Sequence, residues 1–306
     1  SVDPPAGMVV TGHALKPGTG IASTDSWFGP HVRDLVIADG GGLAIMNTMN
    51  WDHNLYAVDT ESGEVRWRQR VGQYFAFSPR LAGDRVAVQG FDFNSAEGYH
   101  LYLMDVTGKP ERRFALYGLP KRLPHRFVPA ILGDRINNFA TSPDGRWVAS
   151  AGDLGLAVWT DDGKVLWTQD WGRTNRHVAT LTAVDDRTLL VIEGMGATAY
   201  RVKDGKAIWK RLLAATGEVR KAKVSADGKT CVLLATTEGG RLFIIRGGQV
   251  VRVIPTGCED AGVSADGSIL AVANDYQLKV YSSTNGLQWT FTGDSRIRFP
   301  SFAPAS

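Results

Sequence analysis

A tight turn recurs along this chain at intervals of about 40 residues. Each turn follows a short apolar segment and precedes a β-branched or aliphatic one. Asp-Gly pairs tolerate the positive φ angles that tight hairpins require. A repeat of this length with four strand-like segments is typical of a β-propeller, in which each repeat forms one blade. The turns are Asp144-Gly145, its equivalent Asp186-Arg187, Asp227-Gly228 and Asp266-Gly267.

The chain has 306 residues, and at about 43 residues per blade this length predicts seven blades. We therefore expect an all-β fold in one domain: a seven-bladed β-propeller of four-stranded antiparallel blades, with the last blade closed by both termini. A truncated chain is the alternative to this closure. The expected blades span about 31–70, 74–117, 135–170, 177–213, 218–255 and 258–293, and residues 296–304 combine with 8–27 in the seventh.

Composition narrows the classes of function. The net charge of +3 is too small to indicate a nucleic-acid surface, and no apolar stretch is long enough to predict a transmembrane helix. The two cysteines match no metal-site spacing, so we expect Cys231, within TCVLLA, to be an inert core thiol. A disulfide with Cys258 is the alternative. The chain starts at Ser1 without an initiator Met, which favours a processed form or an excised segment.

Three segments share one template at identical spacing: AVDTESGEVRW, AVWTDDGKVLW and AYRVKDGKAIW. This pattern resembles the repeat of pyrroloquinoline-quinone-type (quinoprotein-like) propellers. The SPDG and SADG turns that begin at Ser142, Ser225 and Ser264 resemble those of bacterial WD-repeat-like propellers. In the quinoprotein-like family the Trp docks each blade against its neighbour, near the Gly of a hairpin. The resemblance therefore implies a structural role for the Trp of each template, and we extend it to a fourth: Trp67, Trp167, Trp209 and Trp289.

The same resemblance bears on cofactors. Quinoprotein dehydrogenases commonly carry a disulfide between consecutive cysteines over the quinone, and they hold calcium with Glu, Asn and Asp side chains. This sequence has no adjacent Cys pair and no matching ligand set. We expect neither pyrroloquinoline quinone nor calcium to be bound, and a quinone-dependent oxidoreductase is the least favoured function.

Nearly all long loops fall between the second and third strands of a blade or between blades, and these loops share one face of the disc. A binding site on a propeller is expected on this loop-rich face. The residues predicted to bind a ligand there are Trp27, Trp51, Tyr74, Asp92 and Arg126. The candidates for catalysis are His31, Asp52, His53, Arg176 and His177.

Two functions remain open from the sequence. The first is a non-catalytic binding module or scaffold in the bacterial periplasm or outside the cell, with a protein or glycan docked on Trp27, Trp51 and Tyr74. The alternative is a lyase or hydrolase acting on an acidic glycan. A histidine would then serve as general acid or base, and Arg176 or Arg126 would neutralise a carboxylate. The sequence contains no complete catalytic motif, so it does not decide whether the chain is an enzyme.

Overall fold

The structure is a computed structural model, and the residues it describes are 32–38, 41–48, 54–71, 75–91, 99–115, 139–152, 155–170, 178–214, 217–236, 239–257, 260–274 and 276–293. The chain divides into two compact units. One contains Gly12–Ile136 and Thr141–Thr168, and the other contains Ser1–Thr11, Asn137–Ala140 and Gln169–Ser306. Each unit is described by itself.

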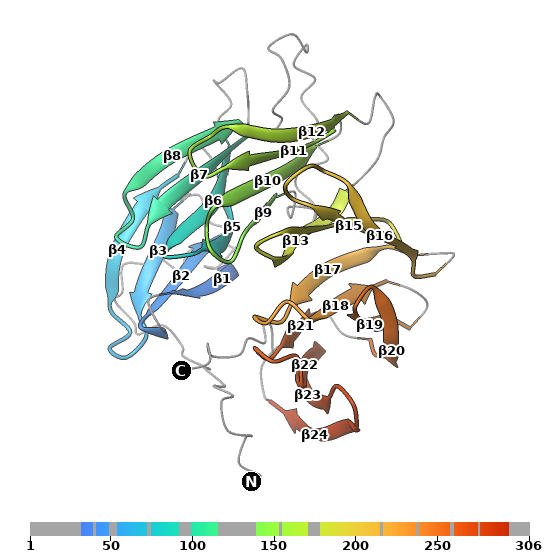
Figure 1. The fold of residues 1–306 in the computed structure, drawn as a ribbon. Coiled ribbons are helices and arrows are strands. Elements are labelled where there is room, and N and C mark those ends of the chain that lie inside the picture. Colours follow the sequence, from blue (N-terminus) through green and yellow to red (C-terminus); the bar gives the residue numbers. More distant parts are fainter. Residues whose placement is uncertain are drawn as a thin grey trace. The chain divides into compact units, whose positions relative to one another are not determined.

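The first half of the strands forms three four-stranded sheets in which the order across the sheet follows the chain (Figure 1). Antiparallel hairpins connect neighbouring strands within these sheets. The strands are β1 (Val32–Ala38), β2 (Leu43–Thr48), β3 (Asn54–Asp59), β4 (Val65–Arg70), β5 (Phe75–Ala82), β6 (Arg85–Phe91), β7 (Tyr99–Asp105), β8 (Pro110–Ala115), β9 (Phe139–Thr141), β10 (Trp147–Gly152), β11 (Gly155–Thr160) and β12 (Val165–Asp170).

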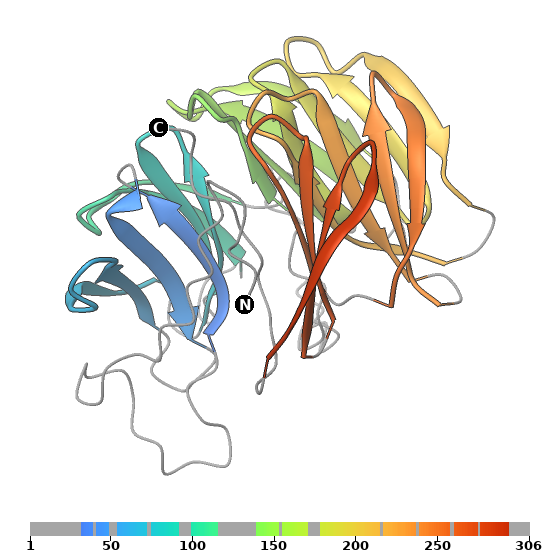
Figure 2. The ribbon, with the colours of Figure 1, turned by 90° about the horizontal axis from the view of Figure 1, so that it is seen from below.

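The second half repeats this arrangement in three further sheets. Figure 2 shows the twist of the last sheet, whose strands are drawn in red. The strands are β13 (Val178–Asp185), β14 (Thr188–Glu193), β15 (Gly196–Arg201), β16 (Ala207–Leu212), β17 (Val219–Val224), β18 (Thr230–Ala235), β19 (Arg241–Arg246), β20 (Gln249–Pro255), β21 (Asp260–Val263), β22 (Ile269–Asn274), β23 (Gln277–Ser282) and β24 (Gly286–Thr292).

The predicted architecture, an all-β propeller of four-stranded antiparallel blades, is confirmed, but the described residues form six blades where seven were predicted. Each of the six is a local meander, so its own turns and strand pattern define it. The seventh was predicted from two distant segments, residues 296–304 and 8–27, and both lie outside the described residues.

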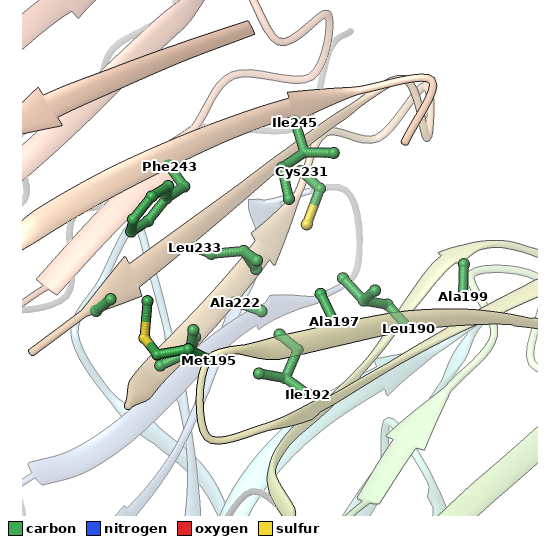
Figure 3. Close-up of a cluster of buried hydrophobic side chains, with 12 residues drawn as sticks. Leu190, Ile192, Met195, Ala197, Ala199, Ala222, Cys231, Leu233, Phe243 and Ile245 are labelled. Atoms are coloured by element: carbon green, nitrogen blue, oxygen red, sulfur yellow. The ribbon is translucent and has the colours of Figure 1, made fainter. Parts of the chain in front are cut away.

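Neighbouring blades within each unit share apolar cores. In the cluster of Figure 3, Leu190 and Ile192 of the fourth blade pack with Leu233, Phe243 and Ile245 of the fifth, and all are buried. Alternate residues of a strand point to opposite faces of its sheet. A strand with apolar residues at every position can therefore pack against the blade on either side. Each large side chain buried in this way contributes about 1.5–3 kcal/mol.

Cys231 lies in this same cluster on β18 and is a free, buried thiol. Burial raises its pKa to about 12, because the thiolate is poorly solvated there. The predicted position of Cys231 in the core is confirmed. Its proposed alternative partner, Cys258, lies outside the described residues.

The recurring Ser-x-Asp-Gly turn closes the hairpin between the first two strands of a blade. The Ser264 hydroxyl donates to Asp266 Oδ1 at 2.7 Å, and the amide of Ile269 donates to Ser264 Oγ at 2.9 Å. The Ser264 hydroxyl and the Ser268 amide lower the pKa of Asp266 to about 2. Gly267 has φ of 71°, and a Cβ there would overlap the Thr230 side chain of the preceding blade. The turn therefore needs glycine for its conformation and for blade packing.

Candidate interaction surface

Two of the template tryptophans, Trp67 and Trp209, join one blade to the next, as predicted. Trp67 Nε1 on β4 donates to the carbonyl of Val106 at 2.7 Å, and its ring lies against Gly108 in the hairpin of the following blade. The ring of Trp209 on β16 lies against Gly248 in the same way. A side chain at Gly108 or Gly248 would collide with the indole, which explains the pairing of the two residue types. These rings are structural.

Several charged groups also connect adjacent blades. Arg85 Nη2 donates to the carbonyl of Gly145 at 2.7 Å and to Asp161 Oδ2 at 3.2 Å. Lys221 Nζ lies 2.9 Å from Oδ2 of Asp260, a carboxylate that is almost fully buried. A buried carboxylate is costly unless it is paired, so Lys221 holds the two blades in register. These charges serve the fold rather than a ligand.

Every residue predicted for the site lies outside the described residues. The structure therefore neither brings these residues together nor separates them. They are Trp27, His31, Trp51, Asp52, His53, Tyr74, Asp92, Arg126, Arg176 and His177.

The described surface has a different feature, which the sequence analysis missed. Among the described strands, the fourth strand of each blade is an edge strand, because it pairs only with the third strand. On β4 the exposed positions alternate with half-buried ones, and the exposed positions are Arg66, Arg68 and Arg70. We call these three residues the arginine edge. The sequence signal of this edge is the alternation of arginines in VRWRQR.

The first member of the arginine edge is fixed by its own hairpin. Arg66 donates to Asp59 Oδ2 through Nη2 at 2.5 Å and through Nε at 3.1 Å. Asp59 also accepts the amides of Glu61 and Ser62. The Ser62 amide and then Arg66 hold the pKa of Asp59 well below its usual range, and Asp59 raises the pKa of Arg66. Arg66 is therefore neutralised locally.

Edge strands of the second half carry other side chains. On β20 the valines Val250, Val251 and Val253 are 39%, 51% and 42% exposed. Its one charged residue, Arg252, is half-buried and donates to the carbonyl of Ser282 in the next blade at 3.2 Å. We call the three valines the valine edge. On β24 the exposed apolar residues are Leu287 and Phe291.

A bulge interrupts the pairing of both edges. The register shifts between Ala57 and Val58 opposite β4, and between Ile244 and Ile245 opposite β20. The extra residues are Arg66 and Val251. Bulges increase the local twist of an edge and shorten the stretch that another strand can join. The continuous part of each edge begins after the bulge, at Trp67 on β4 and at Arg252 on β20.

Among the residues that the structure describes, no group of three or more His, Cys, Asp or Glu side chains is placed to hold a metal ion. Within the same part of the chain, no helix has the length and apolar character needed to cross a membrane.

A protein-family model described as outer membrane protein assembly factor BamB matches residues 1–111 and 132–256. This match confirms the resemblance to pyrroloquinoline-quinone-type repeats. No curated protein matches the chain. Because the family model covers most of the sequence, and because the fold is the propeller that its repeats predict, the chain belongs to the family of outer membrane protein assembly factor BamB.

Proposed function

We propose that this chain is a non-catalytic, protein-binding scaffold that acts in outer membrane protein assembly in the bacterial periplasm. The observation that carries the proposal is the family match over residues 1–111 and 132–256. The described structure supports it, because the template tryptophans Trp67 and Trp209 serve blade packing. A propeller in which tryptophan rings and buried charges hold the blades together is suited to presenting its surfaces to partners.

The partner is a protein rather than a glycan. The family is described by its part in the assembly of proteins, and nothing in that description refers to a glycan. On the loop-rich face we propose Trp27, Trp51 and Tyr74 as anchors, since aromatic side chains dominate the energetics of protein interfaces. Asp92 and Arg126 would form the polar rim around them.

We propose further that the chain works without quinone or calcium. The sequence lacks the adjacent cysteines of quinoprotein dehydrogenases, and the matching family is described by assembly rather than by a redox reaction. Addition of pyrroloquinoline quinone with calcium should leave the absorbance spectrum of the quinone unchanged. A shifted spectrum would contradict this part of the proposal.

The proposal is tested with the variant Trp27→Ala/Trp51→Ala/Tyr74→Ala. Photo-crosslinking to a bacterial envelope extract, followed by mass spectrometry, should show outer membrane proteins or their assembly partners on the wild-type chain, and at least tenfold less on the variant. Tyr276→Ala is the matched control, because it removes an aromatic ring that is 50% exposed on a different loop. Equal thermal unfolding of all three proteins is expected.

Two results would contradict the proposed scaffold function. The first is loss of crosslinking and of thermal stability together, which would make the three aromatic residues structural. The second is turnover of a uronic-acid polymer that disappears in His53→Ala, which would favour the glycan enzyme.

We also propose that residues 296–304 and 8–27 add a seventh blade next to β24. Among the described residues, Trp289 Nε1 is buried and has no hydrogen-bond partner. The equivalent nitrogen of Trp67 is bonded to the following blade. A further blade would supply the missing carbonyl. Slow hydrogen exchange of the Trp289 indole, accelerated when residues 8–27 are deleted, would support this blade; fast exchange in the full chain would exclude it.

A further inference from the structure

The arginine edge combines two properties that bear on binding. The first is geometric: β4 is the last strand of its sheet, so every second peptide group of its continuous part points away from β3. The second is electrostatic: Arg68 and Arg70 are both exposed, and they are two residues apart, which places them on the same face of the strand. An extended peptide pairing with β4 would therefore meet two guanidinium groups in a row.

Strand β4 is held in place by a hydrogen bond to the next blade and by its pairing with a buried residue of β3. Trp67, between Arg66 and Arg68, is tied to the carbonyl of Val106, and Ala57 opposite it on β3 is fully buried. The edge is therefore preorganised, and a partner would not have to order it on binding. Preorganisation of this kind lowers the entropic cost of association.

Charge decides which partner can use this edge. Opposite charges on directly paired residues of neighbouring strands stabilise the pairing, and like charges destabilise it. A second copy of β4 or any basic strand would place positive charge close to Arg68 and Arg70. A strand with carboxylates at alternate positions would place one opposite each of them, and Arg can bind a carboxylate through two parallel hydrogen bonds.

We propose that β4 is a docking edge for an extended, acidic segment of a partner protein. The segment adds as an additional strand of the first blade, with Asp or Glu at alternate positions facing Arg68 and Arg70. Backbone hydrogen bonds contribute affinity, and the two arginines select the sequence. Arg66 takes no part in this selection, because it is the bulged residue and lies outside the continuous part of the edge. This surface is separate from the predicted loop site and does not depend on it.

The test uses fluorescence anisotropy with the full chain and a short capped peptide in which Glu alternates with Val. Three comparison peptides carry Lys in place of Glu, Thr in place of Glu, or N-methyl groups on alternate amides of the Glu peptide. The N-methylated peptide keeps every carboxylate but loses backbone donors. The Glu peptide should bind about tenfold more tightly than the Thr peptide, and more weakly at high salt. The Lys and N-methylated peptides should not bind measurably.

The variant Arg68→Glu/Arg70→Glu should reverse the preference, so that the Lys peptide binds and the Glu peptide does not. The control Arg146→Glu/Lys164→Glu changes the net charge equally at exposed turn residues and should bind the Glu peptide as the wild type does. If circular dichroism shows that the double reversal is unfolded, Arg68→Gln/Arg70→Gln replaces it and should lose about tenfold in affinity for the Glu peptide.

Three outcomes would overturn the inference. If the N-methylated peptide binds as well as its parent, the surface recognises charge alone, as a site for an anionic membrane would. If the Arg68 and Arg70 variants bind the Glu peptide normally, the site lies elsewhere. If the chain dimerises through β4 and the Glu peptide does not compete, the edge belongs to a second copy. The variant Trp27→Ala/Trp51→Ala/Tyr74→Ala should bind the peptide normally, which separates this test from that of the proposed function.

Discussion

The edges β4 and β20 occupy the same position in their blades but expose different chemistry. Each is the fourth strand of a four-stranded sheet, and each has a bulge near its start. The exposed positions of β4 are arginines, whereas β20 exposes three valines and turns its one arginine to the next blade. The repeat fixes the backbone and the packing of each blade, and the outward-facing side chains are left to differ. Specific recognition can therefore reside on one edge without disturbing the fold.

The largest expected effect concerns how each edge is anchored. Trp67→Ala removes the indole that packs on Gly108, and large-to-small core changes of this kind cost about 3–5 kcal/mol. Arg252→Ala removes one hydrogen bond from the anchor of β20 and should cost about 1 kcal/mol. Chemical denaturation of both variants measures the difference. Equal losses would mean that the two edges are anchored equally.

A control separates the ring from its hydrogen bond. Trp67→Phe keeps an aromatic ring beside Gly108 but loses the donor to Val106, so it should cost less than Trp67→Ala. If the phenylalanine variant were as unstable as the alanine variant, the packing explanation would be wrong.

The second effect concerns self-association. Exposed apolar edges invite pairing between chains, and charged residues prevent it. Arg68→Val/Arg70→Val should lower the temperature at which light scattering rises, and Val251→Lys/Val253→Lys should raise it. Both variants should keep free energies of unfolding within about 0.5 kcal/mol of the wild type. Unchanged scattering in both variants would show that edge charge does not control association.

The third effect is the response to acid of the hairpins that precede the two edges. The β3–β4 hairpin contains Asp59, whose pKa is lowered from its ordinary value of 3.8, whereas Gly247-Gly248 leads into β20 without a carboxylate. A lowered pKa in the folded state gives stability that is present above the unfolded pKa and is lost as the pH falls through the folded value. The β4 hairpin should therefore loosen below about pH 4 while the β20 hairpin does not.

Nuclear magnetic resonance of the hairpin amides between pH 5 and 2 measures this difference. Asp59→Asn should remove most of the pH dependence at β4 and leave β20 unchanged. Parallel loosening of both hairpins would assign the acid response to the whole fold. Asp266, whose pKa is also lowered, would then be a better explanation than Asp59.

The sequence predicted what is local and repeated. The Asp-Gly turns, the docking of Trp67 and the buried thiol of Cys231 each depend on residues close in sequence or on the repeat itself, and the structure confirms them. The arginine edge was not predicted, although VRWRQR shows the alternation and the repeat places this segment last in its blade. Alternating charges are also the ordinary pattern of a solvated strand face, so the alternation alone does not mark a docking edge.

The predicted loop site illustrates a different limit. Residues such as Trp51 and His53 were chosen for their chemistry and for their place in long loops, and no period or spacing fixes the distance between such residues. They lie outside the described residues, so their convergence stays a prediction.

The most direct test of edge recognition is backbone hydrogen exchange of the full chain with and without the alternating Glu peptide. Docking on β4 should add protection to the amides of Trp67–Arg70 and leave those of Val250–Val253 on β20 unchanged. Protection of both edges alike, or of neither, would contradict docking on β4.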